Sequence, residues 1–389
     1  MTESIHATPP NATLADMFTP IELVRPPRVL FGGGLVASVG AWARENGIAR
    51  TLVVADAFNA ARVGLLDLPG AVTVFDRVRP EPDTANLDDL LAVAEAAEPQ
   101  LVVGFGGGSA MDLAKLAAVL PGSGQTLADV AGAERVRSKR AALAQVPTTA
   151  GTGSEAGTRA LVTDPAAASK IAVQSLHMLA DLAVVDPDLT MTVPRAVTAA
   201  TGVDALAHCV EAYTNRKAHP AIDLYALAGI RLIGRWLPRA VADGSDREAR
   251  AGLALASLYG GFCLGPVNTA AGHAVAYPLG TRHHVPHGAA NALVFPHVLA
   301  FNAPAVPEKT AGVLAALGLK PVSEPAAVLQ AAHGWCVALG CTMSLSDLGV
   351  PEDDLPRMAE EAHAIRRLLD NNPRPVGRDD ILAMYRAAY

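Results

Sequence analysis

The first half of the chain alternates short apolar runs with amphipathic stretches, and this alternation restricts the possible folds more than any other feature. Each run ends at Asp, Gly or Pro, as strands do when both faces of a parallel sheet are covered. The five runs are TLVVADAF (51–58), AVTVFD (71–76), PQLVVGFG (99–106), AALAQVPT (141–148) and DLAVVDP (181–187). Residues 36–47 and 85–98, which flank these runs, carry a helical period. We therefore predict an α/β fold with a mostly parallel, Rossmann-like sheet, plus an antiparallel hairpin over 160–164 and 170–175.

The second half of the chain follows a different pattern. Long Ala/Leu/Arg stretches separated by Pro and Gly begin near residue 192 and predict a mostly helical region. A length of 389 residues also exceeds the size at which single cores stop growing, so two domains are expected. We place a flexible N-terminal tail at 1–20, an α/β dinucleotide-binding domain at 21–191 and an all-α domain at 192–389, with the seam in 186–194.

Composition narrows the class of protein. The net charge is −7 with no basic block, which does not favour binding to nucleic acid or to an anionic membrane surface. No stretch of apolar residues is long enough to predict a membrane span, and the first twenty residues lack the pattern of a secretory signal. The four cysteines have no CxxC spacing, which fits a reducing compartment. We therefore expect a cytoplasmic protein.

A glycine-rich turn follows the third strand, in the sequence LVVGFGGGSAMDLAK. Glycines let a phosphate approach the backbone, and a helix N-terminus offers unpaired N–H groups and a positive dipole end. Ser109 is expected to cap the helix and to donate to a phosphate oxygen. A plain structural turn has the same composition. The residues assigned to a cofactor phosphate site are Gly106, Gly107, Gly108, Ser109 and Asp112.

A second loop of small residues, VPTTAGTGSEAG (146–157), also follows a strand. Because neighbouring parallel strands end at one edge of a sheet, both loops are expected there. The hydroxyl groups that can contact a cofactor, or simply cap the loop, are those of Thr148, Thr149, Thr152 and Ser154. Asp56 ends another strand, where a carboxylate binds both ribose hydroxyls and favours NAD over NADP, or caps the next helix.

Acidic and imidazole side chains cluster in the helical half. Asp204 and His208 are four residues apart, so both project from one face of a helix. His273 and His287 follow in a region, 273–297, that holds five of the eleven histidines. One carboxylate with several imidazoles suits a divalent metal such as Fe or Zn, although a structural Asp–His hydrogen bond uses the same spacing.

Other residues of this region have less specific interpretations. We expect His283 and His284 to be loop residues near the pocket, and His297 to begin the next helix. Cys209 is interpreted as a buried small hydrophobe, although it is adjacent to His208.

These motifs together resemble the iron-containing (group III) alcohol dehydrogenase family, which includes relatives of lactaldehyde reductase, 1,3-propanediol dehydrogenase and maleylacetate reductase. The resemblance covers nearly everything after residue 20. It rests on FGGG (31–34), GGGSAMDLAK, VPTTAGTGSEAG, DPDLT, TAATGVDALAHCVEAY, HAVAYPLG, PHGAANALVFPHV and NNPRPVGRDDI. It implies a dehydroquinate synthase-like architecture, in which a dinucleotide-binding domain and a helical domain enclose the active site.

The resemblance also implies roles for individual residues. Asp204, His208, His273 and His287 match the metal ligands of the family, and the preferred ion is Fe²⁺, with Zn²⁺ as the alternative. The residues that match its cofactor cleft are Asp56, Gly107, Gly108, Ser109, Thr148, Thr149, Ser154 and Lys170, and Leu189 of DPDLT is assigned there as well.

One position departs from the family pattern. Many members have a second histidine four residues after the third ligand, where this chain has Tyr277. A phenol donates a proton at pH 7 rather than accepting one, unless its pKa is shifted. A proton relay through that histidine therefore cannot be transferred to this chain. A metal-bound water, His283 or His284 would take its place, or the pocket would differ at its substrate end.

The predicted function is metal-dependent, NAD(P)(H)-linked interconversion of a small alcohol and its aldehyde or ketone. No cluster of Arg or Lys accompanies the ligands in the sequence, although Arg159, Arg282 and Arg374 could reach the cleft. A small neutral alcohol/aldehyde pair is therefore the first choice of substrate. The alternatives are reduction of an unsaturated oxo-diacid, as by maleylacetate reductase, and a lyase or cyclase of the dehydroquinate synthase type. We also expect a homodimer or higher oligomer, with VLFGGG as an edge strand at the two-fold axis.

Overall fold

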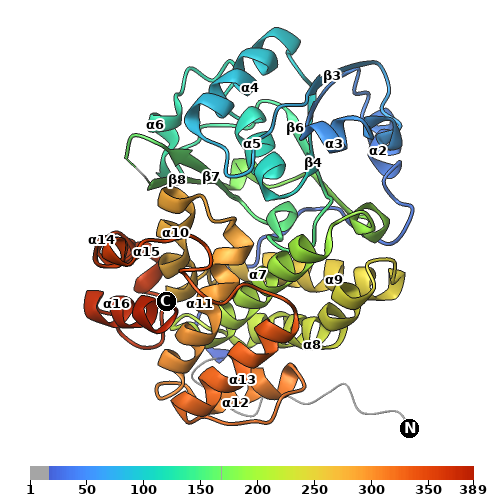
Figure 1. The fold of residues 1–389 in the computed structure, drawn as a ribbon. Helices are drawn as coiled ribbons and strands as arrows, with labels where there is room; N and C mark the ends of the chain where they lie inside the picture. The colour runs from blue at the N-terminus through green and yellow to red at the C-terminus, as the bar shows by residue number, and fades with distance from the viewer. Residues whose placement is uncertain (1–16, 168) are drawn as a thin grey trace.

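The computed structural model describes residues 17–167 and 169–389, so most of the tail predicted over 1–20 lies outside the described residues. A six-stranded parallel sheet forms the upper half of the molecule in Figure 1. Its strands, in spatial order, are β1 (Val29–Phe31), β9 (Leu182–Val185), β6 (Ala142–Pro147), β4 (Leu101–Gly106), β2 (Arg50–Val54) and β3 (Ala71–Phe75). Five of these are the five predicted runs, and the α/β fold class is confirmed. The remaining strand, β1, lies at one edge of the sheet and pairs with β9.

Helices cover both faces of this sheet because successive side chains of a buried strand point to opposite sides. In β2, Leu52 and Val54 pack with α4 (Thr84–Ala97) and α5 (Gly108–Ala117). Val53 points to the other face, where it packs with α2 (Ser38–Glu45). Two apolar clusters therefore enclose the strands, and the loops at the strand ends remain accessible to ligands. The shorter elements of this half are α3 (Ala57–Ala60), η1 (Val63–Leu66) and α6 (Leu127–Val130).

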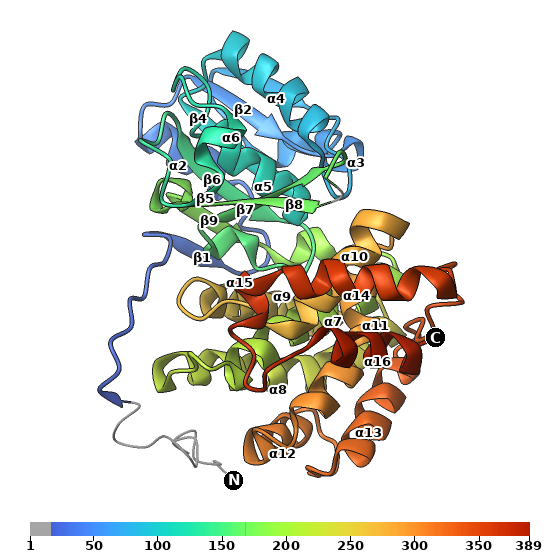
Figure 2. The same ribbon diagram turned by 90° about the vertical axis from the view of Figure 1, so that its left-hand side faces the viewer.

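A second, three-stranded sheet lies between the main sheet and the helices below it (Figure 2). The predicted hairpin is confirmed: β7 (Arg159–Asp164) and β8 (Ser169–Gln174) pair antiparallel, with Val162 opposite Ile171. The short strand β5 (Gly132–Ala133) completes this sheet.

The rest of the chain is helical, as predicted. Its elements are α7 (Arg195–Thr214), α8 (Pro220–Ala242), α9 (Arg247–Leu264), α10 (Ala271–His283), α11 (His287–Asn302), α12 (Pro307–Ala316), α13 (Pro325–Ala338), η5 (Glu352–Asp354), α14 (Leu355–Ala364), α15 (Arg366–Leu369) and α16 (Arg378–Ala387). Three short helical turns precede them: η2 (Ser154–Ala156) between β6 and β7, η3 (Leu176–Met178) between β8 and β9, and η4 (Pro187–Thr190) between β9 and α7. Within the described ranges, no helix has both the length and the apolar character needed to cross a membrane.

The prediction that His297 begins a helix is wrong. His297 lies inside α11, which begins ten residues earlier, at His287. The helix also contains Pro296, although proline removes a backbone donor from a helix interior. Here the neighbouring Phe295 and Val298 are buried in different apolar clusters on the two sides of α11. Packing on both sides therefore keeps the segment helical through the proline.

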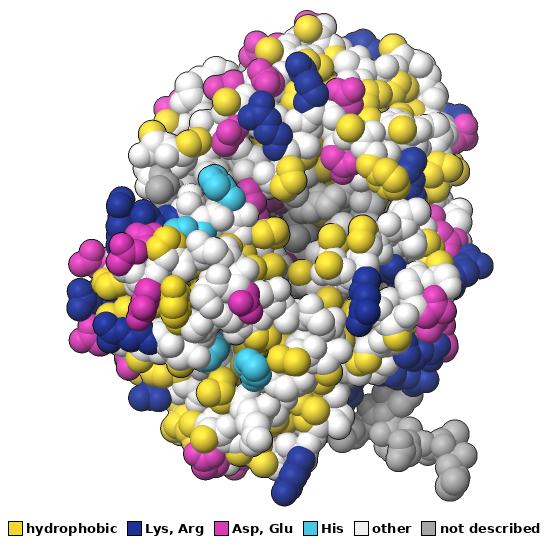
Figure 3. Space-filling view, viewed as in Figure 1, with side chains coloured by type: hydrophobic (Ala, Val, Ile, Leu, Met, Phe, Trp, Pro, Cys, Tyr) yellow, Lys and Arg dark blue, Asp and Glu magenta, His cyan; other side chains and the backbone are white. Residues whose placement is uncertain are grey.

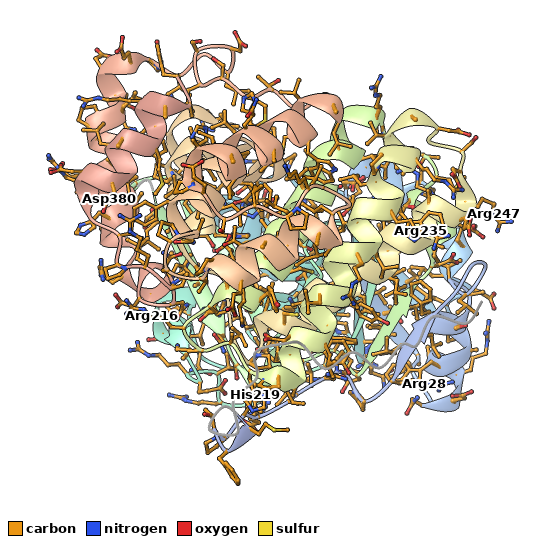
Figure 4. The ribbon with its side chains drawn as sticks, turned by 90° about the horizontal axis from the view of Figure 1, so that it is seen from below. Arg28, Arg216, His219, Arg235, Arg247 and Asp380 are labelled. Atoms are coloured by element: carbon orange, nitrogen blue, oxygen red, sulfur yellow. The ribbon has the colours of Figure 1, made fainter. Side chains whose placement is uncertain are left out.

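The two halves of the molecule touch through a pair of glycines. Gly153 has a φ of +60° in the loop after β6, and a Cβ built on it would lie 2.5 Å from the Cα of Gly261 in α9. A Cβ on Gly261 would likewise lie 2.3 Å from the carbonyl oxygen of Gly153. At the outer edge of the joint, Arg247 of α9 pairs with Asp188 of η4 at 2.8 Å, and Figure 4 shows Arg247 at the periphery. The halves therefore meet backbone to backbone at the loop that follows β6.

Replacement of Gly261 by Ala tests this contact. The added methyl group must displace the Gly153 loop, so we expect Gly261→Ala to lower the free energy of unfolding by about 1–3 kcal/mol. Denaturant unfolding measures the change. Gly334→Ala is the matched control, because Gly334 lies in α13 with nothing within 4 Å of a built Cβ, and it should be neutral or slightly stabilising. Equal stabilities of the two variants would contradict the close approach.

Candidate active site

Helix α7 supplies the first two predicted ligands from one buried face. Asp204 and His208 are separated by about one helical turn, and Glu211 follows on the same side. All three are buried. His273 comes from the first turn of α10, and His287 is the first residue of α11. Three helices therefore bring the four predicted ligands to one place.

The donor atoms of these residues converge. One ligand atom from each of Asp204, His208 and His273 lies within 4.8 Å of the other two. The Nε2 atoms of His208 and His273 are 2.9 Å apart, and His273 Nε2 is 3.6 Å from Asp204 Oδ1. His287 Nε2 lies 3.5 Å from the same carboxylate oxygen. A carboxylate and three imidazoles facing one another are a donor set that fits a divalent transition metal ion.

Burial and neighbouring charges shift the pKa values of the clustered side chains. Burial alone would raise the pKa of Asp204, but His208 and His287 hold it below its usual range. Burial lowers the pKa of His208 to about 4, against the attraction of Asp204. Burial also opposes the charged form of His273, yet Glu211 and Asp204 together raise the pKa of His273 to about 10. The two carboxylates therefore hold one positive charge at this point.

Two further residues orient this cluster, and the sequence analysis missed both. His273 Nδ1 donates to Glu211 Oε1 at 2.7 Å, which directs Nε2 toward the other donors. Asn291 donates from Nδ2 to Asp204 Oδ1 at 2.7 Å. The signal was available in the spacing, since Glu211 lies seven residues after Asp204 and Asn291 lies four after His287.

The cluster opens into a cavity of about 260 Å³ between the two halves. Figure 3 shows the surface hollowed at this level. The predicted residues that line the cavity are Gly108, Ser109, Asp112, Thr149, Thr152, Ser154, Lys170, Asp204, His208, His273, Tyr277 and His287. A wider cavity of about 780 Å³ adjoins it and shares Ser109, Thr149 and His287. The predicted residues found in the wider cavity alone are Asp56, Gly107, Thr148 and Leu189. Gly106 is not among the residues that line either cavity.

Several predicted cofactor residues have structural partners. Asp56 caps α3, because its Oδ1 accepts from the backbone N–H of Asn59 at 3.0 Å, so the capping alternative is observed although Asp56 also faces the wider cavity. Ser109 does not cap α5. The N-cap residue is Gly107, two positions before Ser109, so Ser109 lies inside the first turn. Gly106 is packed closely, since a Cβ there would lie 2.9 Å from Ala110.

Lys115 of the same motif is buried and holds the two loops together. Its Nζ donates to Ser154 Oγ at 2.6 Å and to the carbonyl oxygen of Arg159 at 2.7 Å. Asp112 accepts from Ser154 Oγ at 2.6 Å and from the N–H of Leu161 at 3.0 Å. Asp112 and Ser154 therefore join the glycine turn to the second loop and to β7, in addition to facing the cavity.

The remaining charged residues divide into those inside the cavity and those outside it. Arg159, one of the three arginines that could reach the cleft, lines the cavity with Lys115 and Lys170. Arg282 pairs instead with Asp354 at 2.8 Å, and Arg374 stacks on Phe301, so neither reaches the cavity. Long side chains brought these cations together from separate segments, which linear spacing does not reveal.

The two candidate relay histidines have different surroundings. His283 Nε2 is 2.8 Å from Asp354 Oδ2, and this residue does not line either cavity. His284 adopts a φ of 55° after α10 and lines the wider cavity. Cys209 is buried against Gly229, as predicted, and burial raises the pKa of its thiol to about 12.

Comparison with known proteins identifies the family. The profile "Iron-containing alcohol dehydrogenase" matches residues 26–187, and "Fe-containing alcohol dehydrogenase family, C-terminal" matches residues 198–389. The chain belongs to the iron-containing alcohol dehydrogenase family. Membership implies dependence on a metal ion and on a nicotinamide cofactor.

Individual relatives span the whole chain. It is 36% identical over 383 residues to long-chain-alcohol dehydrogenase 1 of Geobacillus thermodenitrificans, covering 94% of this chain and 96% of the relative. It is 35% identical over 373 residues to 1,3-propanediol dehydrogenase of Klebsiella pneumoniae, covering 92% and 96%. A crystal structure of 1,3-propanediol oxidoreductase matches with a TM-score of 0.90 and 34% identity, covering 95% of this chain and 100% of that one.

Glu211 offers a test of the donor cluster in this member of the family. Glu211→Gln keeps the size of the side chain but removes the charge opposite His273 Nδ1, so we expect metal affinity to fall by about 10–100-fold. Metal content after dialysis against a graded series of chelator concentrations measures this. Glu352→Gln, at an exposed position of η5, is the control and should retain metal like the parent protein. Equal metal retention by the two variants would exclude this role for Glu211.

Proposed function

We propose that this enzyme interconverts a small alcohol and its aldehyde or ketone, with NAD(H) as the redox partner and a divalent metal ion held by Asp204, His208, His273 and His287. The observation that carries the proposal is the convergence of these side chains at the wall of a cavity shared with two small-residue loops. The relatives are named alcohol, propanediol and methanol dehydrogenases, which supports the same reaction class.

The chain's own residues have separable tasks in this reaction. When bound, the metal ion acts as a Lewis acid on the substrate oxygen, and the nicotinamide supplies or accepts the hydride. Glu211 and Asn291 keep the ligand side chains oriented. The backbone of Gly107 and Gly108, at the N-terminus of α5, offers N–H groups to the cofactor phosphates. Thr148, Thr149, Thr152 and Leu189 complete the cofactor walls.

Proton transfer is assigned to the residues nearest the ligand cluster. Tyr277 is 8% exposed and its ring centroid lies 6.1 Å from that of His287. His283 is engaged by Asp354, which removes it from this role. His287 has a more exposed side chain than His273, at 26% against 3%. We therefore place the route for protons on the His287 side of the cavity, which is open toward the wider cavity lined by His284.

The preferred cofactor is NAD and the preferred metal is Fe²⁺. Asp56 lines the wider cavity, where its carboxylate would accept from ribose hydroxyls and repel a 2′-phosphate. Three imidazoles and one carboxylate accept Zn²⁺ as well as Fe²⁺, and the family description favours iron. The maleylacetate reductase and dehydroquinate synthase alternatives are not favoured, because the named relatives are alcohol dehydrogenases.

A coupled assay with metal analysis tests the function. The parent enzyme should give a lasting absorbance change at 340 nm with short alcohols or aldehydes, larger with NAD(H) than with NADP(H), and should contain stoichiometric iron. We expect His273→Ala to lose metal and turnover yet still bind NAD, because the cofactor loops lie on the sheet half. His177→Ala, at an exposed position, is the control. A lyase would leave the net amount of NADH unchanged, and full activity of His273→Ala would refute the ligand assignment.

We also propose that the enzyme is a homodimer joined along β1. This strand lies at the edge of the main sheet, so its outer side is open to pairing with another strand. Phe31 of β1 is 38% exposed, which adds an apolar contact there. Sedimentation equilibrium should therefore give twice the chain mass, and a single-chain mass at micromolar concentration would contradict the pairing.

A further inference from the structure

An outer cavity adjoins the active-site cavity at Tyr277. This outer cavity has a volume of about 500 Å³ and shares Lys170 and Tyr277 with the inner one. The other charged residues that line it are Glu361, Arg366 and Arg367. The inner cavity contains the ligand cluster, so Tyr277 separates a metal-binding end from a distal end. A substrate held by its oxygen at the cluster would extend its other end toward this junction.

Arg159 lines the inner cavity, where two neutral side chains hold its guanidinium group. Its Nη1 donates to Asn268 Oδ1 at 2.6 Å, and its Nη2 donates to Gln174 Oε1 at 2.9 Å. Both acceptors are neutral amides. They fix the plane of the guanidinium but carry no charge of their own. Arg159 forms no ion pair within the described part of the chain, and Asp112 favours its charged form only as the smallest of the effects on its pKa. Burial lowers the pKa of Arg159, which shows that its environment disfavours an isolated cation.

Arg367 approaches the same place from α15. Its guanidinium carbon lies 5.7 Å from the centroid of the Tyr277 ring. Among the residues described, Arg367 likewise forms no ion pair. Its charge also contributes to lowering the pKa of Arg159, after the larger effect of burial, so the two guanidinium groups repel each other across the Tyr277 wall. Two arginines are thus held near one another without a carboxylate between them.

The other charges around the two cavities are already matched. Lys170 pairs with Glu81, and Lys115 pairs with Asp112. Glu361 is held by Arg282 at 3.1 Å. Arg366 pairs with Asp370 on the outer surface. The distal end of the pocket therefore has a surplus of positive charge that belongs to Arg159 and Arg367.

We propose that Arg159 and Arg367 form a binding site for the carboxylate of the substrate, so that the preferred substrate is an oxo acid or hydroxy acid whose carboxylate lies a few carbons from the reacting carbon. The inference rests on the proposed function, because it requires the reacting oxygen to bind at the ligand cluster. A planar guanidinium matches a carboxylate geometrically, and one anion between two arginines relieves their mutual repulsion. In the reduction, the aldehyde carbon gains a hydride from NADH and its oxygen gains a proton, while the carboxylate is unchanged.

The test compares a charged aldehyde with its neutral analogue on the metal-loaded enzyme. Succinic semialdehyde carries the carboxylate, and methyl 4-oxobutanoate replaces it by an ester of similar shape. We expect kcat/KM to be at least about tenfold higher for the acid, because the free energy of one charge-assisted hydrogen bond corresponds to about a tenfold change. Arg367→Gln should remove most of this preference by raising KM for the acid, with little change for the ester, and Arg367→Lys should restore part of it.

The controls separate this inference from the proposed function. Arg366→Gln changes the adjacent arginine, which pairs with Asp370, and should keep the preference for the acid. Arg159→Gln should lower the preference as Arg367→Gln does, with ester turnover reporting whether the variant is folded. Equal kcat/KM for acid and ester in the parent enzyme would overturn the inference and leave the dehydrogenase function intact. A loss of both activities in equal proportion in Arg367→Gln would also overturn it.

Calorimetric titration with 4-hydroxybutyrate and 1,4-butanediol, in the presence of NAD, provides a second readout. Tighter binding of the acid in the parent protein and not in Arg367→Gln supports the carboxylate site even where turnover is slow. Equal binding of the two compounds contradicts it. Absence of turnover with every alcohol and aldehyde, combined with selective binding of the acid, would instead reject the proposed function and keep the anion site.

Discussion

The convergence of electron-rich atoms from Asp204, His208 and His273 is the constraint on which the rest of the structure depends. Three such atoms within 4.8 Å of one another, away from water, repel unless a positive charge lies among them. Hydrogen bonds of Glu211 with His273 and of Asn291 with Asp204 hold these side chains toward the common point. Position 272 requires glycine, because a Cβ there would lie 2.4 Å from Glu211 Oε1. The sequence of α10 is therefore adapted to this contact as well as to its own helical geometry.

The division of the chain into a sheet half and a helical half gives each part of the site a different kind of support. Long buried helices hold the ligand cluster, so its geometry depends on core packing and tolerates little change in volume. Loops at the ends of β4 and β6 hold the cofactor walls, and they reach the helices through the contact of Gly153 with Gly261. Because that contact is made by backbone atoms, the position of the loop after β6 relative to α9 is set without adjustable side chains.

Much of this arrangement could be predicted from the sequence, and the omissions have physical causes. Periodicity identified the strands and the hairpin because both faces of a buried strand are apolar. Helical spacing identified Asp204 and His208 as a pair on one face of a helix. It did not identify Glu211, since a glutamate on a helix is usually solvated. Arg159 and Arg367 are 208 residues apart in the chain, so their proximity depends on tertiary packing and leaves no trace in local spacing. The start of α11 was misplaced because burial keeps the segment around Pro296 helical, and burial depends on tertiary packing.

The two ends of the active-site cavity differ in how strongly the fold constrains them. The ligand end is built from α7, α10 and α11, where each functional side chain also fills core space. The distal end is built from β7, the four-residue α15 and exposed side chains such as Arg367. A substitution of the exposed Arg367 changes charge without disturbing a core, so its cost in stability is small. Substitutions in the ligand cluster are therefore expected to lower the stability of the protein more than a substitution of Arg367 at the distal end. This physical asymmetry allows one fold to keep its hydride chemistry while the charge of the substrate it prefers changes.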